Sequence, residues 1–123
     1  MARILVVDDD PDITFAVSLF LKKDQHDVHT AASRLEGMAA VESYKPDLMI
    51  LDVMMEQPDD GIAMAQELRR TGHRLPIVML TSVSKVTGMR FDRDDDLLPV
   101  DAFLEKPVKP DFLLQKINEL LKK

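Results

Sequence analysis

Several residue types are absent or scarce in this 123-residue sequence, and each absence excludes a class of protein. There is no cysteine, so neither a disulfide framework nor a thiolate metal site is possible. There is no tryptophan, and the only aromatic side chains are one tyrosine and five phenylalanines. The net charge is −6, which argues against a basic surface with interleaved aromatic rings for nucleic acid. We therefore expect no direct nucleic-acid partner.

Long apolar runs are absent as well. The longest cover four residues, such as Ile4 to Val7 and Ile77 to Leu80, whereas a membrane helix needs about 20. Three aspartates interrupt the first run at once, so we expect neither a signal peptide nor contact with a membrane. The length suits one domain over residues 1–123, in a cytoplasmic protein.

Short apolar segments alternate with amphipathic ones along the chain. Continuous apolar runs at Ile4 to Val7, Leu48 to Leu51 and Ile77 to Leu80 are typical of strands buried on both faces. Val28 to Ala32 and Ala102 to Leu104 are weaker strand candidates, and stretches with helical spacing of apolar residues separate the strands. The alternation predicts an α/β fold, a doubly wound five-stranded parallel sheet with helices on both faces, of the flavodoxin-like (βα)5 type.

Capping signals mark two helix starts, Asp60-Gly61 precedes the helical run Ile62 to Leu68, and one later stretch lacks a clear helical pattern. Asp10 before Pro11 predicts an N-cap followed by a first-turn proline, and Ser33 with Glu36 predicts a capping box. Residues 83–100 lack a clean helical period, although the alternation requires the fourth helix of the fold there. We expect that helix to be short, distorted or partly disordered.

Polar side chains follow the predicted strands. Asp8 and Asp9 follow the first, Asp52 the third and Thr81 the fourth, and Lys106 lies just past the fifth. Ligands of an open parallel sheet bind outside the carboxyl ends of its strands, so we expect these five residues at one edge. Three carboxylates close together repel one another and call for a cation. Oxygen ligands without cysteine or histidine suit Mg²⁺.

These segments together resemble the receiver domain of two-component response regulators, in a chemotaxis-regulator-like form. The resemblance covers the whole chain, and it rests on the order of the segments 6–9, 51–52, 80–82 and 103–107. It implies that Asp52 accepts a phosphoryl group from a sensor histidine kinase, a phosphotransfer protein or a small phosphodonor. Such a domain catalyses its own phosphorylation and dephosphorylation and is not counted as an enzyme.

The resemblance also assigns roles to individual residues. Mg²⁺ would be held by the carboxylates of Asp8, Asp9 and Asp52 and by the backbone carbonyl of Met54. Thr81 and Lys106 would contact phosphoryl oxygens, and Thr81 with Phe103 would form the switch that changes a protein-binding surface. We expect output through a downstream protein target, because a receiver domain takes up all 123 residues. The oligomeric state stays open.

Other interpretations of these residues remain at this stage. Asp10 can serve only as a helix cap and Phe103 only as core, and His26 and His29 are expected at the surface. A degenerate receiver could act as a binding module without phosphorylation. A haloacid-dehalogenase-like phosphatase could use Asp8, Thr81 and Lys106, but it would leave Asp52 without a role. A nucleotide-binding module is weaker, since the four glycines form no phosphate-binding loop.

Overall fold

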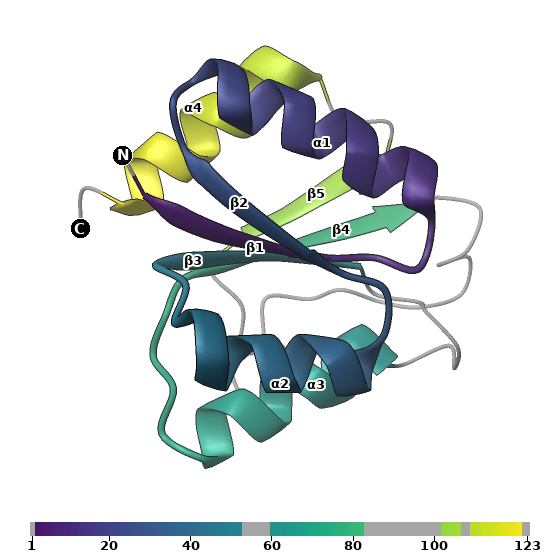
Figure 1. Ribbon diagram of the computed structural model, residues 1–123, viewed down its shortest axis with the longest axis vertical. Helices are drawn as coiled ribbons and strands as arrows, with labels where there is room; N and C mark the ends of the chain where they lie inside the picture. The colour runs from purple at the N-terminus through teal and green to yellow at the C-terminus, as the bar shows by residue number, and fades with distance from the viewer. Residues whose placement is uncertain (1, 53–59, 83–101, 107–108, 122–123) are drawn as a thin grey trace.

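The structure is a computed structural model that describes residues 2–52, 60–82, 102–106 and 109–121. Strands and helices alternate through these ranges, as Figure 1 shows. In chain order they are β1 (Arg3–Val7), α1 (Pro11–Lys23), β2 (Asp27–Ala31), α2 (Arg34–Tyr44), β3 (Leu48–Asp52), α3 (Asp60–Arg70), β4 (Ile77–Ser82), β5 (Ala102–Lys106) and α4 (Pro110–Leu121).

All the strands lie in one parallel sheet with the order β2-β1-β3-β4-β5. The chain adds strands first to one side of β1 and then to the other, which is the doubly wound arrangement. The predicted fold class is confirmed. The fourth helix predicted within residues 83–100 lies outside the described residues, and the helix labelled α4 is the one that follows β5.

The helices cover both faces of the sheet. Figure 1 shows α1 and α4 above the sheet and α2 and α3 below it. Alternate residues of each central strand enter opposite cores, because successive side chains of a strand point to opposite faces. The core under α2 and α3 includes Leu5, Val7, Met49, Leu51, Met64 and Leu68. The core under α1 and α4 includes Ile4, Val6, Val17, Leu21, Ile50 and Ile117.

Both predicted capping signals mark helix starts in the structure. An Oδ1 atom of Asp10 accepts the N–H of Asp12 at 2.9 Å, and Pro11 is the first residue of α1. Oγ of Ser33 accepts the N–H of Glu36 at 3.1 Å. The return bond of this capping box goes one residue further back than the usual pattern, since Glu36 Oε2 accepts the N–H of Ala32 at 2.8 Å.

A glycine lets α2 approach the sheet and α3 closely. A Cβ atom at Gly37 would lie 2.8 Å from Cε of Met64 and 3.2 Å from both Cγ atoms of Val7. The first distance is shorter than real Cβ contacts, so a larger residue would force neighbouring side chains to shift. Cε of Met64 is the far end of a flexible side chain and can move, so the contacts with Val7 on the sheet are the firmer limit on a larger residue here.

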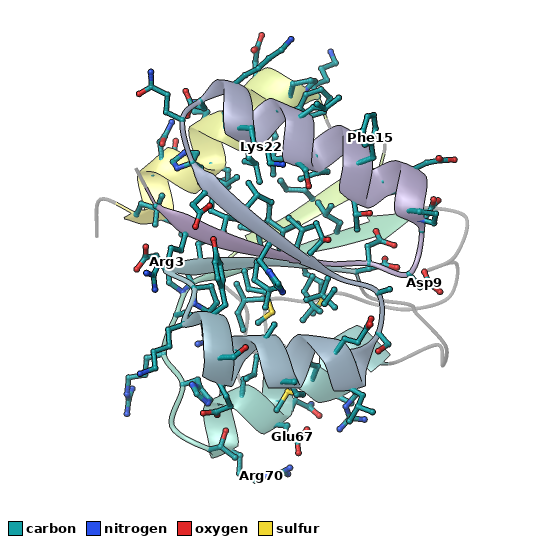
Figure 2. The ribbon with its side chains drawn as sticks, in the orientation of Figure 1. Arg3, Asp9, Phe15, Lys22, Glu67 and Arg70 are labelled. Carbon is teal, nitrogen blue, oxygen red and sulfur yellow. The ribbon has the colours of Figure 1, made fainter. Side chains whose placement is uncertain are left out.

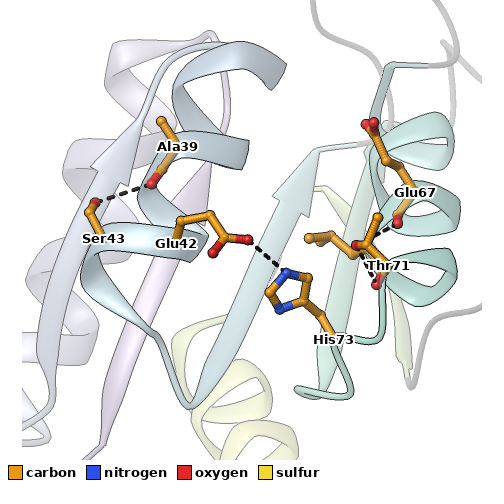
Figure 3. A network of polar contacts seen from close by, with 7 residues as sticks. Ala39, Glu42, Ser43, Glu67, Thr71 and His73 are labelled. Carbon is orange, nitrogen blue, oxygen red and sulfur yellow. Dashed lines mark hydrogen bonds and ion pairs between the residues drawn. The ribbon is translucent and has the colours of Figure 1, made fainter.

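Polar contacts join α2 to α3 and to the turn after α3. Arg34 donates to Glu67 at 3.1 Å near the start of α2, and His73 Nε2 lies 3.0 Å from Glu42 Oε1 near its end. Figure 3 shows the second of these contacts reaching from α2 to the turn. Contacts from both ends of α2 thus reach the last turn of α3 and the turn that follows it. None of the helices in the described residues is long and apolar enough to cross a membrane.

Candidate functional site

The carboxyl ends of β1 and β3 bring two buried aspartates together. Val7 is paired with Leu51 across the two strands, and each is followed in the chain by an aspartate, Asp8 and Asp52. Asp9 comes next, in the turn that leads to α1. Figure 2 shows Asp9 at the edge of the sheet where this turn lies. The geometry follows from the parallel pairing, since neighbouring parallel strands end at the same edge.

The three carboxylates form a compact cluster. One oxygen atom from each of Asp8, Asp9 and Asp52 lies within 4.8 Å of the others. Asp8 is 2% exposed and Asp52 is 3% exposed, whereas Asp9 is open to solvent. Two unit charges at this separation repel by about 3 kcal/mol at an effective dielectric constant near 20. The cluster is therefore costly unless a positive charge lies beside it.

Neighbouring backbone groups hold Asp8 in place. Its N–H donates to the carbonyl oxygen of Ala31 at 3.1 Å, which continues the pairing of β1 with β2. Its Oδ1 accepts the N–H of Asp10 at 3.0 Å. Asp10 itself turns its carboxylate to the first turn of α1, as its helix-capping interpretation predicts. Its side chain is thus engaged in capping, whereas those of Asp8 and Asp9 form the acidic cluster.

The donor set fits a hard divalent cation. Carboxylate oxygens are the only candidate ligands in this cluster of described residues, and the exposed Asp9 leaves the cluster open to solvent on one side. Mg²⁺ is bound in proteins by one or a few carboxylates while it keeps several waters. The residues present therefore suit Mg²⁺.

The remaining predicted site residues on strands share this edge of the sheet. Asp52 is paired with Leu80, and Thr81 is the next residue of β4. Lys106 is paired with Ser82 and ends β5. Thr81 and Lys106 were expected just past their strands, but both are strand residues, because ladder hydrogen bonds continue beyond the last apolar side chain. The side chains of Thr81, Phe103 and Lys106, and all of Met54, lie outside what the structure describes.

A hollow of about 240 Å³ adjoins the cluster, and three of its lining residues were not expected at the site from the sequence. Thr14 of α1, Thr30 of β2 and Glu36 of α2 line it together with Asp8 and Asp9. The position of Glu36 could have been predicted from the sequence, since its capping signal places it in the first turn of a helix. The helix after β2 must begin at the same edge of the sheet as the acidic cluster. Both Thr14 and Thr30 lack such a signal.

Comparison with known proteins identifies relatives over almost the whole chain. The family model described as the response regulator receiver domain matches residues 4–118. The DNA-binding dual master transcriptional regulator RpaA of Synechocystis sp. is 33% identical over 129 residues, covering 100% of this chain and 50% of the relative. The response regulator MprA of Mycobacterium avium is 36% identical over 125 residues, covering 98% of this chain and 51% of the relative. The chain thus spans about half the length of these curated relatives.

Solved structures agree with the sequence relatives. The BeF3-activated N-terminal receiver domain of Klebsiella pneumoniae RstA has a TM-score of 0.80 at 26% identity, covering 98% of this chain and 99% of that one. A receiver domain from Clostridium thermocellum has a TM-score of 0.85 at 24% identity, covering 99% and 95%, and supports the fold alone. The family match favours the receiver over the phosphatase and nucleotide-binding alternatives. The chain belongs to the response regulator receiver domain family, the phosphorelay signalling domains of two-component systems.

Proposed function

We propose that this domain, spanning residues 1–123, is a phosphorylatable switch whose phosphoacceptor is Asp52. The observation that supports this most directly is the meeting of Asp8, Asp9 and Asp52 within 4.8 Å at the carboxyl edge of the sheet. Two of these carboxylates are buried, and such a concentration of negative charge calls for a cation, which could also offset the charge of an incoming phosphoryl group. Membership of the receiver family points to the same chemistry.

In the proposed reaction, an Oδ atom of Asp52 attacks the phosphorus atom of the donor. A P–O bond to Asp52 forms while the P–N bond of a phosphohistidine, or the P–O bond of a small phosphodonor, breaks. The electron pair of the broken bond leaves with the donor, and Asp52 becomes an acyl phosphate. Bound Mg²⁺ would supply positive charge to the phosphoryl oxygens, and Asp8, Asp9, Asp52 and the Met54 carbonyl would hold it.

Three further residues complete the proposed switch. We assign Lys106 to pair with one phosphoryl oxygen and the Thr81 hydroxyl to donate a hydrogen bond to another. Their support is their position on the strands that continue this edge of the sheet. The new phosphoryl group adds charge and acceptor oxygens, towards which the hydroxyl reorients, and Phe103 follows this movement as the second part of the switch.

The proposed partners follow from this role. The phosphoryl donor is a sensor histidine kinase, a phosphotransfer protein or a small phosphodonor, and the exchange takes place in the cytoplasm, where nucleotide can recharge a kinase. The altered surface then binds a downstream protein. The net charge of −6 argues against direct contact of this domain with nucleic acid.

The test is incubation with acetyl phosphate and Mg²⁺ followed by intact mass spectrometry. We expect a gain of about 80 Da for the wild-type chain, which is the mass of one phosphoryl group. Asp52→Asn should abolish the gain, and chelation of the metal should prevent it. Asp12→Asn is the matched control, since it neutralises an exposed carboxylate in the first turn of α1. Absence of any gain would instead support a phosphorylation-independent binding module.

A further inference from the structure

A groove of about 460 Å³ runs between α1 and the edge strand β2. It is lined by Phe15, Ser18 and Lys22 from the helix and by Val28, His29 and Thr30 from the strand. Phe15 is 67% exposed, and Oγ of Ser18 has no hydrogen-bond partner among the described residues although the atom is buried. Figure 2 shows Phe15 and Lys22 at separate points along α1, above β2. The groove is part of neither the acidic cluster nor the proposed phosphoryl site.

The strand at this groove has an unused hydrogen-bonding edge within the described part of the chain. β2 ends the strand order, with β1 as its neighbour. The Asp27 N–H donates to the carbonyl of Ala2, and the Ala31 carbonyl accepts from Asp8, so residues 27, 29 and 31 direct their backbone groups to β1. Alternate residues of a parallel strand face opposite edges. The N–H and C=O groups of Val28 and Thr30 therefore point outward.

The sign of the charge differs between this groove and the hollow beside the acidic cluster, which adjoins it. Lys22 stands near one end, and no carboxylate occurs among the described residues that line this groove. At the other end the groove shares Thr14 and Thr30 with the hollow that holds Asp8, Asp9 and Glu36. A two-fold axis perpendicular to the strand would place the basic end of one copy beside the acidic end of another. The groove and the adjoining hollow together are thus complementary in charge to the same surface of a second copy.

We propose that this edge is a dimer interface in which β2 pairs antiparallel with β2 of a second copy. Among antiparallel registers, the one that places Val28 opposite Thr30 of the other copy uses each of the four outward backbone groups of both copies once, in four interchain hydrogen bonds. It forms two hydrogen-bonded pairs around a central His29 pair and builds one continuous sheet. The opposed β-branched side chains of Val28 and Thr30 favour this pairing.

The second copy would also contribute to the acidic hollow. Pairing in this register directs Lys22 of each copy towards the hollow of the other, where it meets Asp9 and Glu36. Phe15, exposed in the single chain, is covered by the neighbouring helix. The proposed dimer does not depend on phosphorylation of Asp52. A chain that is not phosphorylated by acetyl phosphate could therefore still form this dimer.

Sedimentation velocity over a range of protein concentrations tests the dimer with two matched pairs of variants. Thr30→Pro removes an outward N–H that β1 does not use, whereas Thr30→Val keeps it. We expect the proline variant to weaken the dimer about tenfold or more, since two interchain hydrogen bonds are lost, and the valine variant to dimerise as the wild type does. Lys22→Glu should weaken the dimer, and Lys23→Glu, outside the groove, should leave it unchanged.

Hydrogen exchange on the wild-type chain locates the interface without any substitution. The amides of Val28 and Thr30 should become protected as the protein concentration rises, while exposed amides elsewhere do not. A wild-type chain that remains monomeric up to about 1 mM overturns the proposal, because association that weak is not a specific interface. A dimer that leaves these two amides unprotected, or that survives Thr30→Pro, overturns it as well.

Discussion

Tyr44 illustrates how single residues tie the far end of this sheet together. Its hydroxyl donates to Asp27 Oδ2 at 2.8 Å, its ring stacks on His29 with centroids 5.1 Å apart, and Arg3 lies over the ring. Burial, followed by the hydrogen bond and the negative charge of Asp27, raises the pKa of Tyr44 from 10.0 to about 12. The neutral phenol is therefore favoured in the folded chain.

This shift gives stability a defined dependence on alkaline pH. The contribution of neutral Tyr44 is fully present below pH 10 and is lost as the pH rises through about 12, because the folded pKa exceeds the unfolded one. We expect Tyr44→Phe to lower the free energy of unfolding at pH 7 by about 0.5–1.5 kcal/mol, because the hydrogen bond to Asp27 is lost. Between pH 9 and 12 the variant should lose less further stability than the wild type in urea unfolding. Parallel pH profiles for the two proteins would contradict this.

Single residues also show what sequence reasoning could and could not foresee. The meeting of Asp8, Asp9 and Asp52 follows from strand ends in a parallel sheet, so apolar patterning sufficed to predict it. The surface position expected for His26 is wrong, since its side chain is 7% exposed and Nδ1 accepts the N–H of Ala2. The preceding residue, Gln25, has a φ of 66°, a positive value that is uncommon for residues other than glycine. The sequence therefore offers no reason to expect a turn at this position.

At the scale of an element, α2 depends on its cap more than on its interior serine. Ser33 satisfies the N–H of Glu36, whereas Ser43 donates to the carbonyl of Ala39, which already accepts a helix hydrogen bond. Figure 3 shows the Ser43 contact on the surface of α2. The same substitution at these two positions thus separates the capping effect from helix propensity.

We expect Ser33→Ala to destabilise the protein by about 1 kcal/mol through the lost cap. Ser43→Ala should be neutral or stabilise it by a few tenths of a kcal/mol, because alanine has the higher helix propensity. Urea unfolding followed by circular dichroism measures both. An equal loss for the two variants would show that the Ser33 contact does not act as a cap.

Elements were predicted well in kind and less well at their ends. The continuous run Leu48 to Leu51 predicts a buried strand, and β3 indeed has every residue buried, including Asp52. The strand reaches that aspartate because parallel pairing with β4 continues to Leu80. An apolar pattern reports the nature of the side chains, whereas a strand ends where its backbone pairing ends. A carboxylate inside a strand is therefore wrongly placed after the strand when only the apolar pattern is used.

At the scale of the whole molecule, we expect the acidic cluster to link folding stability to the binding of the proposed Mg²⁺. Asp8→Asn keeps an oxygen acceptor for the Asp10 N–H but removes one buried charge beside Asp52. In chelator we expect this variant to be more stable than the wild type by about 1 kcal/mol, or roughly 4 °C in melting temperature. With Mg²⁺ the difference in stability between the variant and the wild type should shrink or change sign, because only the wild type keeps all the proposed metal ligands.

Thermal melts with chelator and with increasing Mg²⁺ measure both effects. Asp12→Asn again serves as the control, since its carboxylate lies exposed on α1, and its response to Mg²⁺ should equal that of the wild type. An Asp8→Asn protein that responds to Mg²⁺ like the wild type would remove Asp8 from the metal site.

The pairing of β1 with β3 has a consequence for the newly made protein. Asp8 and Asp9 leave the ribosome more than forty residues before Asp52, and α1, β2 and α2 are made in the interval. Until β3 docks beside β1, the two early aspartates are ordinary solvated side chains that do not repel Asp52. The acidic cluster comes into being only with the long-range contact at the centre of the sheet, so a nascent chain cannot present the three carboxylates together before β3 has docked beside β1.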